Sequence, residues 1–155
     1  MKLTSTAFHH GKKIPSIYTC DGKNISPPLT IAEAPEGTQS FVLLMDDPDI
    51  PDFAKQNYNI EVWDHWVVFN IPPDTTEIPE GKNPKGILGK NTRGNLAYGG
   101  PCPPDREHRY MFKLYALHTL LSLEEGATKK EVEQAMKGKI IEETVLIGVY
   151  ERQQQ

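Results

Sequence analysis

Three segments of the sequence concentrate side chains that bind ligands or transfer protons. They are Asp46 to Pro51, Trp63 to Ile71 and Tyr98 to Tyr110, which supply carboxylates, imidazoles, a thiol and phenols. Each segment is apolar or proline-rich around its polar residues, so those residues stand on stiff backbone. Convergent polar groups on rigid elements are what a small ligand pocket needs, and the three segments together predict one.

Each segment taken alone also has a purely structural interpretation. Asp46, Asp47 and Asp49 would repel one another at a strand end unless a cation or hydrogen-bond donors meet them, but they could form a solvated turn. His65 could be a core histidine whose hydrogen bonds are satisfied within the fold. The Gly- and Pro-rich stretch that begins at Tyr98 could be a rigid corner.

The elements that must position these residues are mainly strands. Apolar, β-branched and aromatic runs predict strands over residues 40–45, 63–71, 109–117 and 144–150. Because side chains alternate along a strand, one face of the second strand should carry Trp63, His65, Val67, Phe69 and Ile71. Trp66 should then pack on the opposite face. By the same alternation, His108 and Tyr110 should point to one side of the third strand.

One helix is predicted near the C-terminus. Thr128 and Glu131 form a capping box, and Val132 and Met136 follow at helical spacing, with Gly138 placed to end the helix. Residues 71–98 are rich in Gly, Pro, Asn and Thr, which predicts an irregular loop with a short hairpin. The expected fold class is therefore mainly β with a C-terminal helix.

Length, charge and hydropathy exclude several classes of protein. The 155 residues predict a single domain over residues 1–155, and the net charge of −4 without a long basic run argues against a nucleic-acid partner. The longest apolar run, Phe41 to Met45, is too short for a membrane span, and no signal peptide follows Met1. A cytoplasmic protein with reduced Cys20 and Cys102 is the simplest expectation, although a bridge between them is left open.

Four motifs resemble one known family, the phosphatidylethanolamine-binding proteins, which include the Raf kinase inhibitor proteins. Three of the motifs are Asp47-Pro48-Asp49-Ile50-Pro51, His65-Trp66-Val67-Val68-Phe69-Asn70-Ile71-Pro72, and Gly99-Gly100-Pro101-Cys102-Pro103-Pro104 with His108-Arg109-Tyr110. The opening, from Phe8 to Leu29, resembles the bacterial and archaeal branch of that family. The resemblance runs from about Leu3 to Tyr150.

The resemblance implies a large antiparallel sheet packed with a smaller sheet, a C-terminal helix, and an anion pocket at one rim of the large sheet. The matching site residues are Asp47, Asp49, His65, Pro103, His108 and Tyr110, and Cys102 stands where the family's loop offers a backbone N–H to the anion. Family members that act on kinases or inhibit a serine carboxypeptidase make a protein kinase or protease a further expected partner, and dimeric relatives suggest a homodimer. The sequence departs from the family pattern over residues 105–107 and in the long stretch of residues 52–64, which affects the width and rim charge of the pocket, and it also departs at Ala97.

The expected chemistry is binding of a phosphate, a carboxylate or a phospho-headgroup, without an enzymatic step and without a cofactor, as part of a regulatory function. His65, His108 and Tyr110 would donate hydrogen bonds to the anion, and Asp47 would orient a histidine rather than touch the ligand. A pocket that has lost its ligand, in a protein that acts only through a protein partner, is a third interpretation.

Two enzymatic alternatives use the same residues. A hydrolase could use Cys102 and a histidine, but the surrounding prolines lack the N–H groups that stabilise an oxyanion. A metal centre could use Asp47, Asp49, His65 and His108, but they lack the close spacing of known metal motifs.

Overall fold

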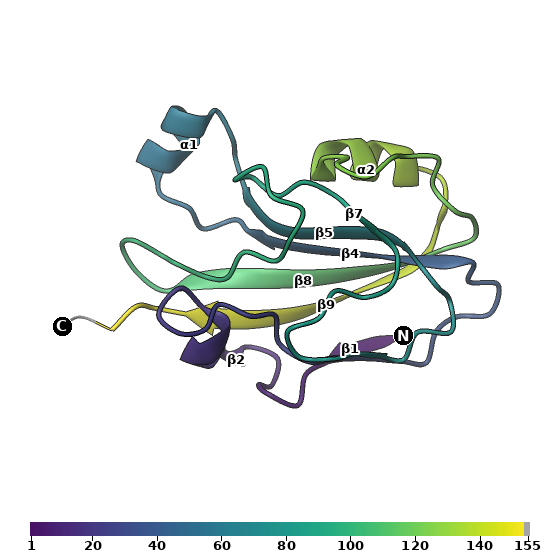
Figure 1. Ribbon diagram of the computed structural model, residues 1–155, viewed down its shortest axis with the longest axis horizontal. Coiled ribbons are helices and arrows are strands. Elements are labelled where there is room, and N and C mark those ends of the chain that lie inside the picture. The colour runs from purple at the N-terminus through teal and green to yellow at the C-terminus, as the bar shows by residue number, and fades with distance from the viewer. Residues whose placement is uncertain (154–155) are drawn as a thin grey trace.

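The computed structural model describes residues 1–153, which form two β-sheets and three short helices (Figure 1). The small sheet has the strand order β1 (Lys2–Thr4), β3 (Leu29–Ala32), β6 (Glu77–Ile78). The large sheet has the order β2 (Lys12–Lys13), β9 (Ile140–Tyr150), β8 (His108–Leu117), β4 (Ser40–Asp47), β5 (Trp63–Ile71), β7 (Ile87–Leu88). All neighbouring strands are antiparallel except β2 and β9. The helices are η1 (Ser16–Tyr18, a 3-10 helix), α1 (Asp52–Tyr58) and α2 (Lys129–Met136).

Both faces of the large sheet are covered. On one face, Leu43 of β4 and Phe112 of β8 are buried in a cluster that includes Ile31 of the small sheet. On the other face, Val42 of β4 packs in a second cluster with Val132 of α2. Figure 1 shows α2 above the large sheet and β1 below it. The layers are therefore small sheet, large sheet and helix, and the sequence prediction of a mainly β fold with a large sheet, a smaller sheet and a C-terminal helix is confirmed.

The alternation of side chains along β5 is interrupted twice, which corrects the predicted face of His65. Met45 pairs with Trp66 but the next residue, Asp46, pairs with Asp64, so His65 is an extra residue on its strand. Such a bulge re-aims one side chain without breaking the pairing of the strands. His65 therefore lies on the same face as Trp66, although it was predicted on the opposite one.

A second irregularity in β5 lies near Asn70, which has a left-handed φ of 54°. As a result Phe69 packs on the α2 side, whereas Ile71 packs toward the small sheet, although the two were predicted on the same face. The predicted burial of Trp66 is confirmed, since its side chain is fully enclosed in that same cluster.

The other predicted elements differ from the structure mainly in extent. β5 has the predicted bounds, whereas β4, β8 and β9 are longer than predicted. The capping box of Thr128 and Glu131 begins α2 as expected. The two short strands between residues 71 and 98 pair with different sheets, so the predicted hairpin is wrong. Helix α1 was not predicted. Within residues 1–153, no helix is long and apolar enough to cross a membrane.

Candidate functional site

The predicted site residues gather at one end of the large sheet. β4 ends at Asp47, β5 begins at Trp63 and β8 begins at His108, so these antiparallel strands bring their polar ends together. A cavity of about 650 Å³ opens there, which is within the usual range for a small-molecule site. Of the seven predicted residues, six line this cavity, namely Asp47, His65, Cys102, Pro103, His108 and Tyr110.

His108 is held between two carboxylates. Its Nδ1 lies 2.7 Å from Oδ2 of Asp47, and its Nε2 lies 2.6 Å from Oδ1 of Asp105. Burial lowers the pKa of His108, but the bonds to Asp47 and then Asp105 outweigh it, so the pKa is raised. The imidazole is therefore favoured in its charged form, with both N–H groups donated to carboxylates. The predicted role of Asp47 as an orienting group agrees with this geometry.

Asp49 is the predicted residue that does not line the cavity. Its two carboxylate oxygens accept hydrogen bonds from the Arg109 guanidinium at 2.9 and 2.8 Å, and Oδ2 also accepts the Arg109 backbone N–H. These bonds lower the pKa of Asp49 to about 2, with burial opposing them. The structure thus places Asp49 as the partner of Arg109, where it ties the loop after β4 to the start of β8.

His65 is fixed by the backbone of Gly99. The Nδ1 of His65 lies 2.6 Å from the Gly99 carbonyl oxygen, and the Gly99 N–H donates to the His65 carbonyl at 2.9 Å. A carbonyl only accepts, so Nδ1 carries a proton. Burial lowers the pKa of His65, although the Gly99 bond and Asp47 oppose this, so the ring is favoured in its neutral form.

Tyr110 carries a buried hydroxyl without a partner. The side chain is fully enclosed, and its hydroxyl makes no hydrogen bond within residues 1–153. Its ring contacts His65 edge-on, at 5.3 Å between centroids, and stacks on His108 at 6.3 Å. Burial, followed by Asp47, raises the pKa of Tyr110 above its ordinary value, so the hydroxyl remains a donor. Buried polar groups are nearly always paired in native proteins, and this exception points to a missing partner.

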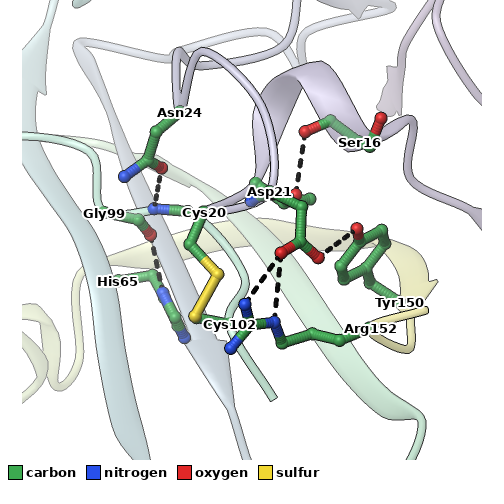
Figure 2. Close-up of a disulfide and its surroundings, with 11 residues drawn as sticks. Ser16, Cys20, Asp21, Asn24, His65, Gly99, Cys102, Tyr150 and Arg152 are labelled. Carbon is green, nitrogen blue, oxygen red and sulfur yellow. Dashed lines mark hydrogen bonds and ion pairs between the residues drawn. A yellow bond between two sulfur atoms is a disulfide. The ribbon is translucent and has the colours of Figure 1, made fainter. Parts of the chain in front are cut away.

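A disulfide joins Cys20 to Cys102, which corrects the expectation of reduced thiols. The two Cα atoms lie 5.4 Å apart although 82 positions separate the residues. Figure 2 shows the bridge beside His65, with Gly99 and Asn24 next to it. Asn24 Oδ1 accepts the Gly100 N–H at 2.8 Å, and the Cys20 N–H donates to the Pro101 carbonyl at 3.0 Å. These bonds and the disulfide hold the loop before β3 to the proline-rich loop, residues 98–107. Both cysteines line the cavity. The predicted donor role of the Cys102 backbone N–H stays a prediction.

Sequence reasoning missed other parts of the site. The sequence shows Asp105 only as a departure from the family pattern, and its spacing of three from His108 is no signal for contact, because residues 105–107 form no helix. Phe53 and Tyr58 of α1 line the mouth of the cavity and are more than half exposed. The Tyr58 ring meets the edge of the Trp63 ring at 5.0 Å between centroids, and the Trp63 ring lies 5.9 Å from the Arg93 guanidinium. The cavity thus has an inner end with His65 and Tyr110 and an aromatic mouth.

The comparisons with known proteins decide the family. The model of the phosphatidylethanolamine-binding protein family matches residues 4–151. The chain belongs to this family. A UPF0098 protein of Methanothermobacter thermautotrophicus is 49% identical, over 98% of this chain and 99% of that protein. A UPF0098 protein of Chlamydia trachomatis is 43% identical, over 98% of this chain and 99% of that protein.

Solved structures of the phosphatidylethanolamine-binding protein family agree. The crystal structure of CT736 from Chlamydia trachomatis, described as a putative homolog of this family, superposes with a TM-score of 0.92, at 43% identity over 97% of both chains. The crystal structure of E. coli YbcL, described as a new member of the mammalian family, superposes with a TM-score of 0.86, at 32% identity over 98% of both chains. The two-sheet fold is therefore the family fold.

The described residues contain no cluster of ligands that would support a metal centre. Within residues 1–153, no group of three or more His, Cys, Asp or Glu side chains is arranged to hold an ion. Asp49 is bonded to Arg109, and the two nitrogens of His108 are directed at carboxylates. Charged imidazole does not ligate metals, because the ligating nitrogen must be deprotonated.

Proposed function

We propose that this member of the phosphatidylethanolamine-binding protein family is a binding protein for a small oxyanion, such as phosphate, a carboxylate or a phospho-headgroup, and that it catalyses no reaction. The observation that carries the proposal is the unpaired, buried hydroxyl of Tyr110 in a cavity that His65 and His108 also line. A hydroxyl in that position lacks an acceptor, and a ligand oxygen would supply one.

The arrangement of charge also supports a positioned anion. Asp47 and Asp105 hold a charged His108 at the inner end of the cavity, and Arg93 lies at its mouth. A cation that carboxylates hold in place keeps its position when no ligand is bound, so its positive charge already acts on an arriving anion. The aromatic side chains at the mouth, Phe53 and Tyr58, offer contact area for an apolar part of the same ligand.

The hydrolase alternative is less well supported than binding. Its nucleophile would be the Cys102 thiolate, but the Cys102 sulfur is bonded to Cys20. A disulfide sulfur is not a nucleophile, so that chemistry would require prior reduction. The loop around Cys102 also contains Pro101 and Pro103, which supply no N–H groups for an oxyanion.

The test is binding of inorganic phosphate and phosphoethanolamine, measured by calorimetry and by soaking crystals. We expect density for a tetrahedral group between His65 and Tyr110, and loss of most of the affinity in Tyr110→Phe. His118→Gln is the control, because the exposed His118 ring bonds to the Gly138 carbonyl and does not line the cavity. If neither probe binds, or if His118→Gln weakens binding as much as Tyr110→Phe, the proposed site is wrong.

We also propose that anion binding serves a regulatory function that acts through a protein partner. A protein kinase or a protease is the proposed class of partner, and a homodimer is the proposed assembly. Size-exclusion chromatography with light scattering, and inhibition assays against purified kinases and serine proteases with wild type and Tyr110→Phe, test these points. A monomer would contradict the proposed assembly, and a partner effect unchanged in Tyr110→Phe would separate any regulation from the cavity.

The proposed location is the cytoplasm, but the disulfide between Cys20 and Cys102 is unusual for that compartment. Disulfides persist most readily in oxidising compartments and are rare in reducing ones. The expectation of reduced Cys20 and Cys102 therefore no longer supports a cytoplasmic location. Fractionation of the native cell, with alkylation of free thiols before lysis, would decide both the location and the state of the two sulfurs.

A further inference from the structure

The two nitrogens of the His108 ring have no hydrogen-bonding capacity left for a ligand. Both ring nitrogens of His108 face carboxylate oxygens, of Asp47 and Asp105, and carboxylates at neutral pH only accept. Both N–H groups of His108 are therefore already donated. A ligand could take one of them only by displacing a carboxylate from a bond of 2.6 or 2.7 Å.

His65 presents the opposite capacity. Its Nδ1 proton is donated to the Gly99 carbonyl, and Figure 2 shows the other ring nitrogen on the side away from Gly99. A neutral imidazole has only one N–H, so Nε2 carries a lone pair and accepts. No group within residues 1–153 forms a hydrogen bond with this Nε2. The sequence predicts that His65 donates a hydrogen bond to the anion. At neutral pH, however, the free nitrogen of His65 is an acceptor.

Tyr110 supplies the remaining hydrogen-bond donor in the cavity. Its hydroxyl is the buried donor without a partner, and its ring is in edge contact with the His65 ring in the same cavity. The inner end of the cavity thus offers one acceptor, on His65, and one donor, on Tyr110. A fully deprotonated oxyanion satisfies only the donor and meets the lone pair of His65, whereas an oxyanion that keeps one O–H satisfies both.

We propose that the site takes its oxyanion in a protonated form, a hydrogen phosphate or a phosphomonoester monoanion, with the ligand O–H donated to Nε2 of His65 and a second ligand oxygen accepting from Tyr110. This inference rests on the proposed anion-binding function and specifies its ligand. It also excludes sulfate as a good ligand near neutral pH, because sulfate has the same tetrahedral shape but no O–H to donate.

The charged groups around His65 define the pH range in which this holds. Asp46 and Asp47 at the end of β4 favour the charged ring, and Arg93 opposes it, together with burial. Tyr110 on β8 and Gly99 in the proline-rich loop add no charge. If acid protonates His65, both ring nitrogens donate, and the site then accepts an oxyanion without an O–H.

The experiment compares inorganic phosphate with sulfate by calorimetry across the range from about pH 5.5 to about pH 8.5, around the ordinary histidine pKa of ~6.5. We expect phosphate to bind at least about tenfold more tightly than sulfate near neutral pH, a difference of about 1.4 kcal/mol. The affinity of phosphoethanolamine should fall as the pH rises above the second pKa of its phosphate group, about 6, because its dianion has no O–H, whereas the inorganic phosphate dianion still has one. Repeating the phosphoethanolamine titration in buffers of different ionisation enthalpy should reveal proton uptake on binding above that pKa, because the dianion must take up a proton to donate to His65.

Two variants separate the roles. In His65→Gln, the side-chain amide can donate or accept, so the preference for phosphate over sulfate should shrink toward twofold. In Tyr110→Phe, both ions should bind more weakly while the preference remains. If the His65 variant does not fold, the proton count on the wild type still decides the question.

The possible outcomes distinguish the two proposals. Equal binding of phosphate and sulfate near neutral pH, without proton uptake, would leave anion binding intact and overturn the protonated-ligand inference. Binding of neither ion across the whole pH range would overturn the proposed function and this inference together. A preference for phosphate with proton uptake supports both.

Discussion

The carboxylates of Asp46 and Asp47 at the end of β4, and of Asp49 just after it, show how single residues determine this site. Their mutual repulsion predicted that a cation or donors must meet them, and each one has its own partner. Asp46 pairs with Lys113 and Lys129, Asp47 with His108, and Asp49 with Arg109. Three adjacent acids are thus directed to three different parts of the structure, and only Asp47 reaches the cavity. The sequence predicted the need for partners, but the partners lie 60 to 83 positions away, beyond any local pattern.

Asp105 is expected to control the charge of His108. In Asp105→Asn the pKa of His108 should fall, because one of the two carboxylates that raise it is removed. A raised pKa stabilises the fold below the unfolded value of ~6.5, and that stabilisation is lost as the pH rises through the folded value. In the variant the loss should therefore occur at lower pH. NMR titration of the His108 ring and denaturant unfolding across the same pH range would measure both effects.

Glu107→Gln is the control for this prediction. It removes the same charge from the same loop, but Glu107 is exposed and its carboxylate makes no bond to His108. An equal fall of the His108 pKa in both variants would mean that the effect is long-range electrostatics and not the hydrogen bond. Anion affinity should rise more in Asp105→Asn than in Glu107→Gln, since the carboxylate that competes for His108 is removed only there.

The Tyr110 hydroxyl should favour ligand binding but not the stability of the fold. A buried hydroxyl without a partner destabilises a fold by about 1–3 kcal/mol, so Tyr110→Phe should leave the free energy of unfolding unchanged or raise it. The same variant should bind phosphate more weakly. Tyr98→Phe is the matched case with the opposite sign, because the Tyr98 hydroxyl donates to the Tyr18 carbonyl at 2.7 Å and its loss should destabilise by about 1 kcal/mol. A clear loss of stability in Tyr110→Phe would mean that its hydroxyl has a partner in solution.

Among the elements, β5 and α1 show where sequence patterns stop being informative. The composition of β5 gave its bounds correctly, yet the face of His65 depends on one bulged residue that period-two alternation cannot anticipate. Helix α1 has seven residues, one buried residue and no side-chain cap, so it carries almost no helical signal. In contrast, the capping box and the apolar spacing of α2 made that helix predictable. The residue types of the site were therefore recognisable, but the side from which His65 approaches was not.

The proline-rich loop should depend on a single glycine. A Cβ on Gly100 would lie 2.2 Å from the Asn24 side-chain oxygen and 2.5 Å from the Tyr18 carbonyl oxygen, which is closer than atoms can approach. Gly100→Ala should push the two loops apart and destabilise by about 1–3 kcal/mol, measured by thermal or denaturant unfolding. Phosphate affinity should fall as well, since Gly99 holds His65.

The neighbouring glycine is the control. A Cβ on Gly99 would meet nothing closer than 3.5 Å, and its φ is not in the left-handed region, so Gly99→Ala should be tolerated. Similar losses in the two variants would show that the loop tolerates no side chain at all. Unchanged stability in Gly100→Ala would mean that the contact between the loops is not maintained in solution.

The whole molecule is held together at the site end by the bond between Cys20 and Cys102. The sequence left this bridge open, because a separation of 82 positions says nothing about distance until the fold is known. Closing a loop of that length is worth about 4.5 kcal/mol in the chain-entropy model. We expect that reduction, or the double variant Cys20→Ser with Cys102→Ser, lowers the free energy of unfolding by roughly this amount.

Thiol titration provides the check on that expectation. The unfolded, non-reduced protein should contain no free thiol, and reduction should release two. Equal stability before and after reduction, together with two reactive thiols in the untreated protein, would mean that the bond is not formed under those conditions. The double variant also tests the cavity, since both sulfurs line it and their separation should weaken phosphate binding.

The same bond makes a covalent ring of residues 20–102, and α1 lies inside it. Phe53 and Tyr58 are 57% and 59% exposed, so a chymotrypsin-like protease has two accessible cleavage points on this ring. A cut there opens the ring without releasing a fragment. The nicked protein should therefore migrate as a single band on a non-reducing gel and as two bands after reduction. Cleavage at the mouth of the cavity would thus yield a two-chain molecule of unchanged composition, apart from one added water.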